Sequence, residues 1–256
     1  MEINIITKYL NEIFNPHLTM DGDFIGFQHN SKNINIKNIY ILLDLTLSEL
    51  ELIKEKADLI ITHHPLFFGD KNEILKNDRR VKKIYKILKS HDISLFVIHT
   101  NADFNINNIA LFQLKKIFNV DTYQSIKDNN LIIAESIKLK EYITFEKIKE
   151  SIFNLNISNS IRFNKNNKII NKIIISSGSN FLNKDKGVNT LHITGELKWH
   201  QWVEILDLNL NFIELCHCSE YVFLEMIENI LRKEFSQVSV VSIKPKLFEI
   251  ELHGNK

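Results

Sequence analysis

Short apolar runs alternate with amphipathic segments along most of the chain. In the first half, runs rich in branched residues are typical of buried strands at Asn38–Leu45, Ala57–Thr62 and Ile93–Ile98. Hydrophobic residues with helical spacing predict helices at Leu47–Lys56, Arg79–Ser90 and Asn107–Phe118. Strands and helices that alternate over so short a distance predict a parallel sheet with helices on both faces.

The alternation continues after the polar pair Asn129 and Asn130, which marks a seam. Strands are predicted at Lys172–Ser176, Thr190–Thr194 and Phe212–Cys216, and two more near Val238–Ile243 and Leu247–Leu252. Helices are predicted near Thr144–Phe153, at Trp199–Leu206 and after Ser219, a good N-cap. The chain begins with a predicted helix from Ile5 to Phe14 and a predicted loop at Asp21–Phe27. We therefore predict an α/β protein with two halves, residues 1–128 and 129–256.

Charge and cysteine content narrow the class of protein. The formal net charge of +1 gives no strong electrostatic reason to bind nucleic acid or an anionic membrane. No stretch approaches the roughly 20 apolar residues of a membrane helix, and the first residues lack the pattern of a secretory signal. The only cysteines, Cys216 and Cys218, are so close in sequence that we expect no disulfide, which fits a reducing, cytoplasmic environment.

Two consecutive histidines stand where a predicted strand opens. The apolar run Leu59–Ile61 ends at Thr62, His63 and His64 follow, and Pro65 stops the strand because it has no N–H for the ladder. At a strand end the backbone leaves the pleat, so both imidazoles can reach one site. We interpret the pair as part of a metal site; the alternative is two solvated loop histidines.

Three predicted strand ends carry residues of the metal-ligating type: His63 and His64, His99 and Asp103, and His217 and Glu220. Open α/β sheets bind ligands outside the carboxyl ends of their strands. Three of these four histidines with the two carboxylates suit two divalent ions, and such mixed ligands are compatible with zinc, iron, manganese or nickel. For His99, a hydrogen bond to a backbone carbonyl is the favoured alternative. Asp44 also ends a strand on this side, but strand-end acids are common.

Four segments also match, in order and separation, the motifs of a known family. They are LIITHHPLFF at Leu59–Phe68, IHTNADFNINN at Ile98–Asn108, TGELKWHQW at Thr194–Trp202 and CHCSE at Cys216–Glu220. The chain resembles the dinuclear-metal-centre hexameric proteins, the NGG-interacting-factor-three-like family, whose bacterial members are named GTP cyclohydrolase 1 type 2 homologues. The resemblance implies two similar, intertwined three-layer α/β/α halves, no inserted middle domain, and a metal site between the halves at strand C-terminal ends.

The resemblance implies particular residues as metal ligands: His63, His64, Asp103, His217 and Glu220, with Asp103 and Glu220 bridging two ions. It places Glu196 and His200 near the metals, where they would orient ligands or face the substrate. His217 and Glu220 are three positions apart, whereas the family has four, so Cys216 is an alternative ligand. We favour His217, since a loop absorbs a one-residue deletion easily.

The functional expectation follows from the resemblance. It implies a homohexameric, dinuclear metal-dependent hydrolase that acts on a nucleotide-like or phosphorylated substrate, as the label GTP cyclohydrolase suggests. The sequence contains neither a P-loop nor a Rossmann glycine pattern. The alternative is a non-catalytic metal-binding protein, either a metallochaperone, a metal store or a ring-shaped scaffold. A ring that threads nucleic acid is a third hypothesis, which the near-neutral charge disfavours.

Overall fold

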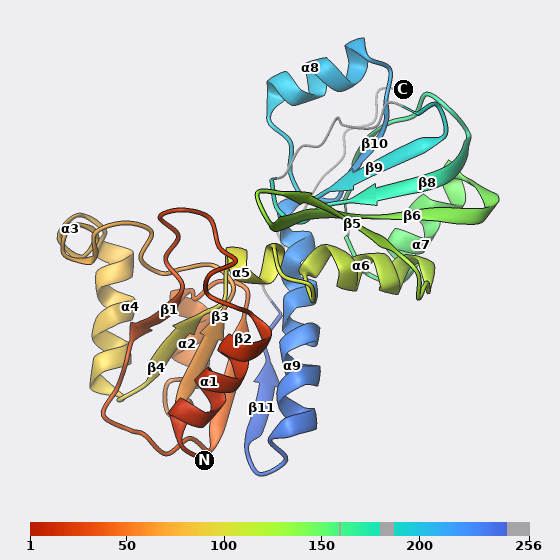
Figure 1. Cartoon of the computed structure of the whole chain (residues 1–256). Helices are drawn as coiled ribbons and strands as arrows, with labels where there is room; N and C mark the ends of the chain where they lie inside the picture. The colour runs from red at the N-terminus through yellow and green to blue at the C-terminus, as the bar shows by residue number, and fades with distance from the viewer. Residues whose placement is uncertain (159, 180–186, 245–256) are drawn as a thin grey trace.

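The computed structural model describes residues 1–158, 160–179 and 187–244. These residues form two sheets in separate lobes, with α6 (Ile109–Phe118) and α9 (Val222–Glu234) passing between them (Figure 1). The predicted α/β class is confirmed. The last predicted strand, Leu247–Leu252, lies outside the described residues.

The first sheet has the strand order β1-β4-β3-β2-β11. Its bounds are Gly26–His29 for β1, Asn38–Leu42 for β2, Leu59–Thr62 for β3, Ser94–Val97 for β4 and Ser239–Ser242 for β11. Only β1 is antiparallel to its neighbour. The parallel strands β3 and β4 are buried at every position, as the continuous apolar runs predicted.

Helices cover both faces of the first sheet. One face packs against α1 (Ile3–Ile13) and α9 in the larger hydrophobic core. The other packs against α2 (Leu47–Ile53) and α4 (Arg79–Ser90) in a second core. Both helices start at side-chain caps that the sequence provides: Thr46 with Glu49 forms a capping box at α2, and Asp78 caps α4. Two short helices complete this lobe, α3 (Lys71–Asn77) and α5 (Thr100–Asp103).

The second sheet has the strand order β5-β6-β8-β9-β10-β7. Its bounds are Gln124–Asp128 for β5, Leu131–Thr144 for β6, Arg162–Asn164 for β7, Ile169–Ile175 for β8, Thr190–Thr194 for β9 and Asn211–Glu214 for β10. Strands β8, β9 and β10 are parallel, and the outer pairings are antiparallel. One face packs on α6 and α7 (Phe145–Asn154), and α8 (Trp199–Asp207) packs near β10 on the other.

Each half of the sequence contributes a strand to the sheet formed mainly by the other half. Strand β5 ends at residue 128 and lies in the second sheet, and β11 comes after residue 128 and completes the first sheet next to β2. Asn129 and Asn130 both have positive φ and form the tight turn between β5 and β6. The division into residues 1–128 and 129–256 stays a prediction.

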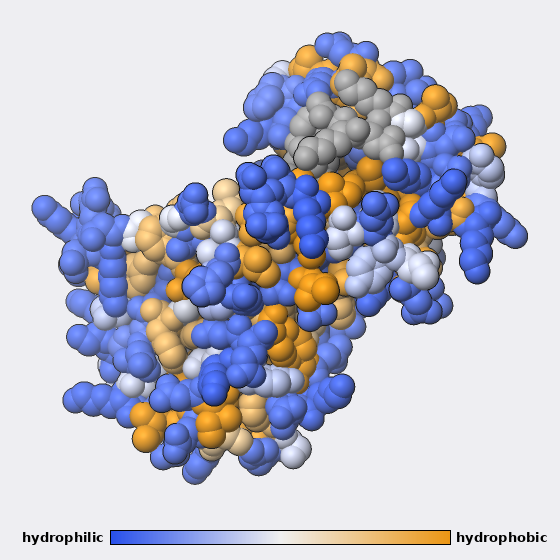
Figure 2. Space-filling model, in the orientation of Figure 1, coloured by the Kyte–Doolittle hydropathy of each residue, from blue (hydrophilic) through white to orange (hydrophobic). Residues whose placement is uncertain are grey.

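Two local expectations are wrong. Gly26 and Phe27 begin strand β1, although the sequence predicted a loop through Phe27. Helix α3 was not predicted, because none of its residues is buried and its pattern shows no apolar stripe. The visible face is mostly hydrophilic, with hydrophobic side chains gathered along the middle, where the lobes meet (Figure 2).

Candidate metal centre

The predicted ligands come together between the two lobes. His63 and His64 follow β3, and Asp103 ends α5, which directly follows β4. His217 and Glu220 lie in a 3₁₀ turn, His217–Tyr221, that follows β10. The carboxyl ends of strands from both sheets therefore supply the cluster, as expected for an open α/β sheet.

Three imidazoles point their Nε2 atoms at one carboxylate oxygen. Glu220 Oε2 lies 3.7 Å from His63 Nε2, 3.1 Å from His64 Nε2 and 3.0 Å from His217 Nε2. The Nε2 atoms of His64 and His217 are only 3.2 Å apart. The fifth predicted ligand, Asp103, has its Oδ2 atom 3.8 Å from His63 Nε2.

The cluster divides into two overlapping sets. The inner trio is His63, Asp103 and Glu220, and the outer trio is His64, His217 and Glu220; in each trio the ligand atoms lie within 4.8 Å of one another. Glu220 belongs to both, which suits a carboxylate that bridges two ions. A third compatible group combines His63 and His64 with His99.

Each histidine is fixed by a partner on its other ring nitrogen. His63 Nδ1 donates to the carbonyl oxygen of Ile98 at 2.9 Å. His64 Nδ1 lies 2.9 Å from Asp44 Oδ1, and His217 Nδ1 lies 2.8 Å from Glu196 Oε2. A proton held on Nδ1 leaves Nε2 as the ligand atom, and this arrangement is typical of metal-binding histidines.

The carboxylates are held as well. Ser177 donates a 2.8 Å hydrogen bond to Asp103 Oδ1. Gly178 lies against Glu220, since a Cβ there would stand 3.0 Å from Oε1, and its φ of 58° is one that glycine adopts freely. The sequence shows Ser177 and Gly178 only as residues after a strand, and Asp44 only as a common strand-end acid.

Burial and charge set opposite protonation states in the two trios. Burial lowers the pKa of His63 to about 3, so its imidazole is neutral. Burial also opposes charge on His64, but hydrogen bonds to Asp44 and Glu220 outweigh it and raise its pKa to about 10. The hydrogen bond to Glu220 raises the pKa of His217 to about 9. Burial and the charge of Glu220 raise the pKa of Asp103 well above its usual value.

Glu220 remains ionised within this cluster. Burial favours the neutral acid, but the hydrogen bonds from His217 and His64 hold the pKa of Glu220 well below its usual range. Both rings lie within hydrogen-bond distance of Glu220 Oε2, and their Nε2 atoms are 3.2 Å apart. Bound cations would take the place of protons on these nitrogens.

The Nε2 atom of His63 is the clearest candidate for a metal-ligand atom. His63 Nε2 is completely buried and has no hydrogen-bond partner among the described residues. A buried polar atom without a partner is costly, and a metal ion would satisfy it. The donor set of imidazole nitrogens and carboxylate oxygens suits divalent transition metals. The residues present therefore fit metal ions.

His99 lies at the rim of the cluster with a different partner from the one predicted. Its Nδ1 atom is 2.7 Å from Asp23 Oδ1, so a carboxylate, and not a backbone carbonyl, holds the ring. Asp23 also accepts a hydrogen bond from the backbone N–H of Thr100. Burial opposes its charge, but the hydrogen bonds from His99 and Thr100 outweigh it and keep the pKa of Asp23 well below its usual range.

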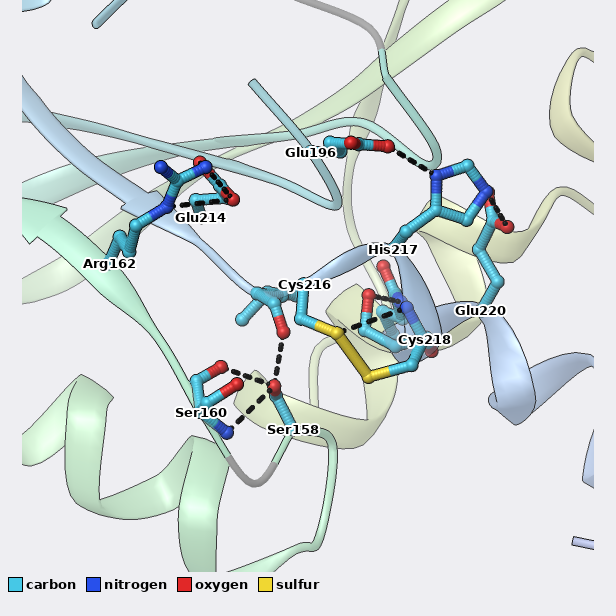
Figure 3. The surroundings of a disulfide bond; sticks show 12 residues. Ser158, Ser160, Arg162, Glu196, Glu214, Cys216, His217, Cys218 and Glu220 are labelled. Carbon is cyan, nitrogen blue, oxygen red and sulfur yellow. Dashed lines mark hydrogen bonds and ion pairs between the residues drawn. A yellow bond between two sulfur atoms is a disulfide. The ribbon is translucent and has the colours of Figure 1, made fainter. Parts of the chain in front are cut away.

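The prediction that Cys216 and Cys218 form no disulfide is wrong. Their sulfur atoms are bonded, and their Cα atoms are 5.3 Å apart, within the usual range for a disulfide (Figure 3). The chain folds back here because Cys216 has a φ of 77° and the 3₁₀ turn starts directly after it. Cys216 therefore carries no free thiolate that could replace His217 in the cluster.

The two additional predicted residues lie in different surroundings. Glu196 contacts the outer trio through His217, and Figure 3 shows the His217 ring between Glu196 and Glu220. His200 lies exposed on α8 and belongs to none of the metal-compatible groups formed by the described residues.

Comparison with known proteins gives a consistent picture. The family model Duf34/NIF3 (NGG1p interacting factor 3) matches residues 1–246. A GTP cyclohydrolase 1 type 2 homolog from Mycoplasmopsis pulmonis is 29% identical over 222 residues, which cover 84% of this chain and 87% of the relative. Another from Ureaplasma parvum is 30% identical over 207 residues, which cover 77% of this chain and 78% of the relative.

Solved structures show the same fold. A hypothetical protein from Staphylococcus aureus matches 98% of this chain and 99% of its own with a TM-score of 0.84 and 21% identity. Reduced HcgD from Methanocaldococcus jannaschii matches 94% of this chain and 97% of its own with a TM-score of 0.77 and 23% identity. Within the part of the chain that the structure describes, no helix has the length and apolar character needed to cross a membrane.

Proposed function

Because the chain belongs to the Duf34/NIF3 family, we propose that it is a dinuclear metal-dependent hydrolase of a nucleotide-like or phosphorylated substrate. The relatives named GTP cyclohydrolase 1 type 2 homolog support GTP as the first substrate to test. In this proposal His63, Asp103 and Glu220 hold an inner ion, and His64, His217 and Glu220 hold an outer ion.

The observation that carries the proposal is the convergence of three Nε2 atoms on Glu220 Oε2 at 3.0 to 3.7 Å. Each histidine has its Nδ1 atom tied to a separate acceptor, so all three rings are already oriented. Such orientation lowers the entropic cost of binding an ion. Two bound divalent ions would supply Lewis-acid polarisation of a phosphoryl or carbonyl oxygen and activation of water.

Side chains at the rim support a substrate site next to the ions. The Phe68 side chain is 68% exposed, and its ring contacts those of Phe24 and His99. This apolar wall suits the planar ring of a nucleotide-like substrate. Asp23 holds the His99 ring at the same rim, where it can position the substrate by hydrogen bonding.

We propose a homohexamer as the working assembly. Exposed apolar side chains on α8 support association between copies: Trp199 is 80% exposed, Leu206 57% and Val203 41%. Mass photometry of the full chain tests this, and a Trp199→Glu variant is expected to shift the distribution toward smaller species. A hexamer unaffected by this change would mean that α8 is not the interface.

A non-catalytic metal carrier is the second candidate. The outer ligand His217 has a side chain that is 43% exposed, which favours exchange of the outer ion with solution. A carrier would bind and release metal without turning over any substrate.

One experiment separates these two functions. Metal-free protein is reloaded with zinc, iron, manganese or nickel and assayed against GTP and a panel of phosphoesters. Metal-dependent turnover that disappears in Glu220→Gln supports the hydrolase. Stoichiometric metal binding without turnover of any substrate would contradict the hydrolase and favour the carrier.

A further inference from the structure

The Cys216–Cys218 disulfide brackets one residue of the metal centre. His217 stands between the two cysteines, and its imidazole is part of the outer trio. In Figure 3 the sulfur atoms lie on the opposite side of the loop from the His217 ring and Glu196. The disulfide is therefore placed to control the backbone of His217 without contacting an ion itself.

Hydrogen bonds anchor the loop directly before Cys216 and directly after Cys218. Before Cys216, Leu215 N donates to Thr194 O at 2.8 Å, and Ser158 donates to the carbonyl oxygen of Leu215. After Cys218, the buried amide of Gln113 donates to Ser219 O at 3.1 Å. Between these anchor points, Cys216, His217 and Cys218 are only half-buried.

Apart from the contacts of the His217 ring with Glu196, Glu220 and His64, few hydrogen bonds among the described residues hold Cys216, His217 and Cys218 in place. The backbone N–H of Cys218 points at Cys216 Sγ at 3.2 Å, and Ser219 N donates to Cys216 O at 3.0 Å. Cys216 has a φ of 77°, in a left-handed region that residues other than glycine seldom adopt. The covalent link opposes relaxation of this residue, so loss of the link would let the His217 backbone move.

We propose that Cys216 and Cys218 are a thiol–disulfide exchange site and that its redox state sets the affinity of the outer metal position. The oxidised form holds His217 in the outer trio, and the reduced form binds the outer ion more weakly. The inner trio takes His63 and Asp103 from other segments, and its third ligand, Glu220, follows the anchored Ser219, so the inner position is insensitive to the exchange. This inference rests on the metal centre proposed above, but not on its catalytic activity.

The partner in the exchange is a dithiol reductant. One of its thiolates attacks a sulfur of the disulfide, the S–S bond breaks, and the released cysteine thiolate takes up a proton. The second thiol of the reductant then attacks the mixed disulfide and releases the other cysteine as a thiol, so the reductant leaves as a disulfide. Two electrons and two protons pass to Cys216 and Cys218. Cys216 and Cys218 are both half-buried residues, so part of the disulfide segment is open to such a reagent.

Manganese binding to the full chain tests the proposal. Oxidised protein and protein reduced on an immobilised reductant, then separated from it under argon, are titrated with Mn²⁺ while the free ion is measured by electron paramagnetic resonance. Mn²⁺ prefers oxygen and nitrogen over thiolate, so freed thiols do not create a site of their own. We expect the weaker class of Mn²⁺ sites to lose about 10- to 100-fold in affinity on reduction, the size typical for a ligand that loses its orientation.

Two variants serve as matched controls. The double variant Cys216→Ser/Cys218→Ser is expected to bind like the reduced protein whatever the redox conditions, and His217→Ala should show weak outer binding in both. Thermal melting checks that both variants remain folded. Thiol titration should find two thiols per chain only after reduction, one from each cysteine.

Several outcomes would overturn the proposal. They are equal Mn²⁺ affinity in both redox forms, free thiols in protein treated with oxidant, or oxidised-like affinity in the serine double variant. Tighter zinc binding after reduction would also overturn it, since it would make the cysteines ligands themselves. Binding of Mn²⁺ to neither form would instead refute the metal centre, so the two failures can be told apart.

Discussion

The inner and outer trios share Glu220 but differ in almost every other respect. The inner trio is buried, with side-chain exposures of 0% for His63 and 12% for Asp103. The outer trio is open, with 20% for His64 and 43% for His217. A buried set of ligands holds an ion with little exchange, whereas an open one leaves a face for solvent or substrate. We infer that an ion at the inner position would exchange slowly and that the outer position is the one open to solvent or substrate.

The largest expected effect comes from a change that should empty both trios at once. Glu220→Gln takes the charge from the only residue that both trios share, so both ions should be lost. Elemental analysis after dialysis against metal buffer measures this. The exposed residue Glu141 provides the control, and Glu141→Gln should retain full metal content. Retention of both ions by Glu220→Gln would contradict the shared-ligand assignment.

Removing one ligand from each trio should separate them. His63→Ala should lose the inner ion and, because the ring is fully buried, destabilise the metal-free protein by roughly 2–3 kcal/mol. His217→Ala should lose the outer ion and also destabilise the metal-free protein, because the buried Glu220 carboxylate loses a hydrogen-bond partner. Metal content with urea denaturation tests both variants. Loss of the same ion in both variants would contradict two separate trios.

The pH dependence of metal binding should also distinguish the trios. An outer ion must displace protons from His64, with a pKa of about 10, and from His217, with a pKa of about 9. Outer affinity should therefore rise by up to about 100-fold per pH unit below pH 9, since each displaced proton contributes a factor of ten.

Binding of the inner ion should displace fewer protons. His63 has a pKa of about 3 and is already neutral, so only Asp103, whose pKa burial raises, has a proton to lose. Inner affinity should rise by at most about tenfold per pH unit. Titrations with a chelating buffer at several pH values give both slopes. Identical slopes for the two ions would contradict the assigned protonation states.

The smallest expected effects come from residues that orient ligands without belonging to the trios. Asp44→Asn removes the charged partner of His64 and should weaken the outer ion by about 10- to 100-fold. Ser177→Ala removes the hydrogen bond to Asp103 and should weaken only the inner ion. Isothermal titration of each variant measures the two sites. Weakening of the same site by both changes would argue against separate trios.

The elements that the sequence predicted well are those that bury a whole strand or a clear apolar stripe of a helix. Strands β3 and β4 are continuous apolar runs, and α4 occupies its predicted bounds because its apolar stripe and its Asp78 cap agree. Strand β1 and helix α3 escaped prediction because neither buries a residue completely. The hydrophobic pattern of a sequence reflects burial, so elements without buried residues, such as β1 and α3, are hard to recognise from it.

The site shows a similar division. The residue types at strand ends pointed to the metal-compatible cluster, because parallel strands bring their carboxyl ends to one edge. The partners Asp44, Ser177 and Asp23 could not be assigned, since each depends on how two distant loops meet. The disulfide was missed because its geometry arises from the φ of 77° at Cys216, which sequence spacing does not reveal.

The position of β11 has a consequence for how the protein is made. This strand, Ser239–Ser242, is the last described element of the chain, yet it completes the sheet that the first strands begin. A ribosome must therefore deliver the chain through Ser242 before the first lobe can close. Glu220 emerges just before it, so the nascent chain cannot assemble either trio early. Metal capture is thereby deferred until Glu220 has been synthesised, and chains truncated before this residue are left without both a closed lobe and a complete metal site.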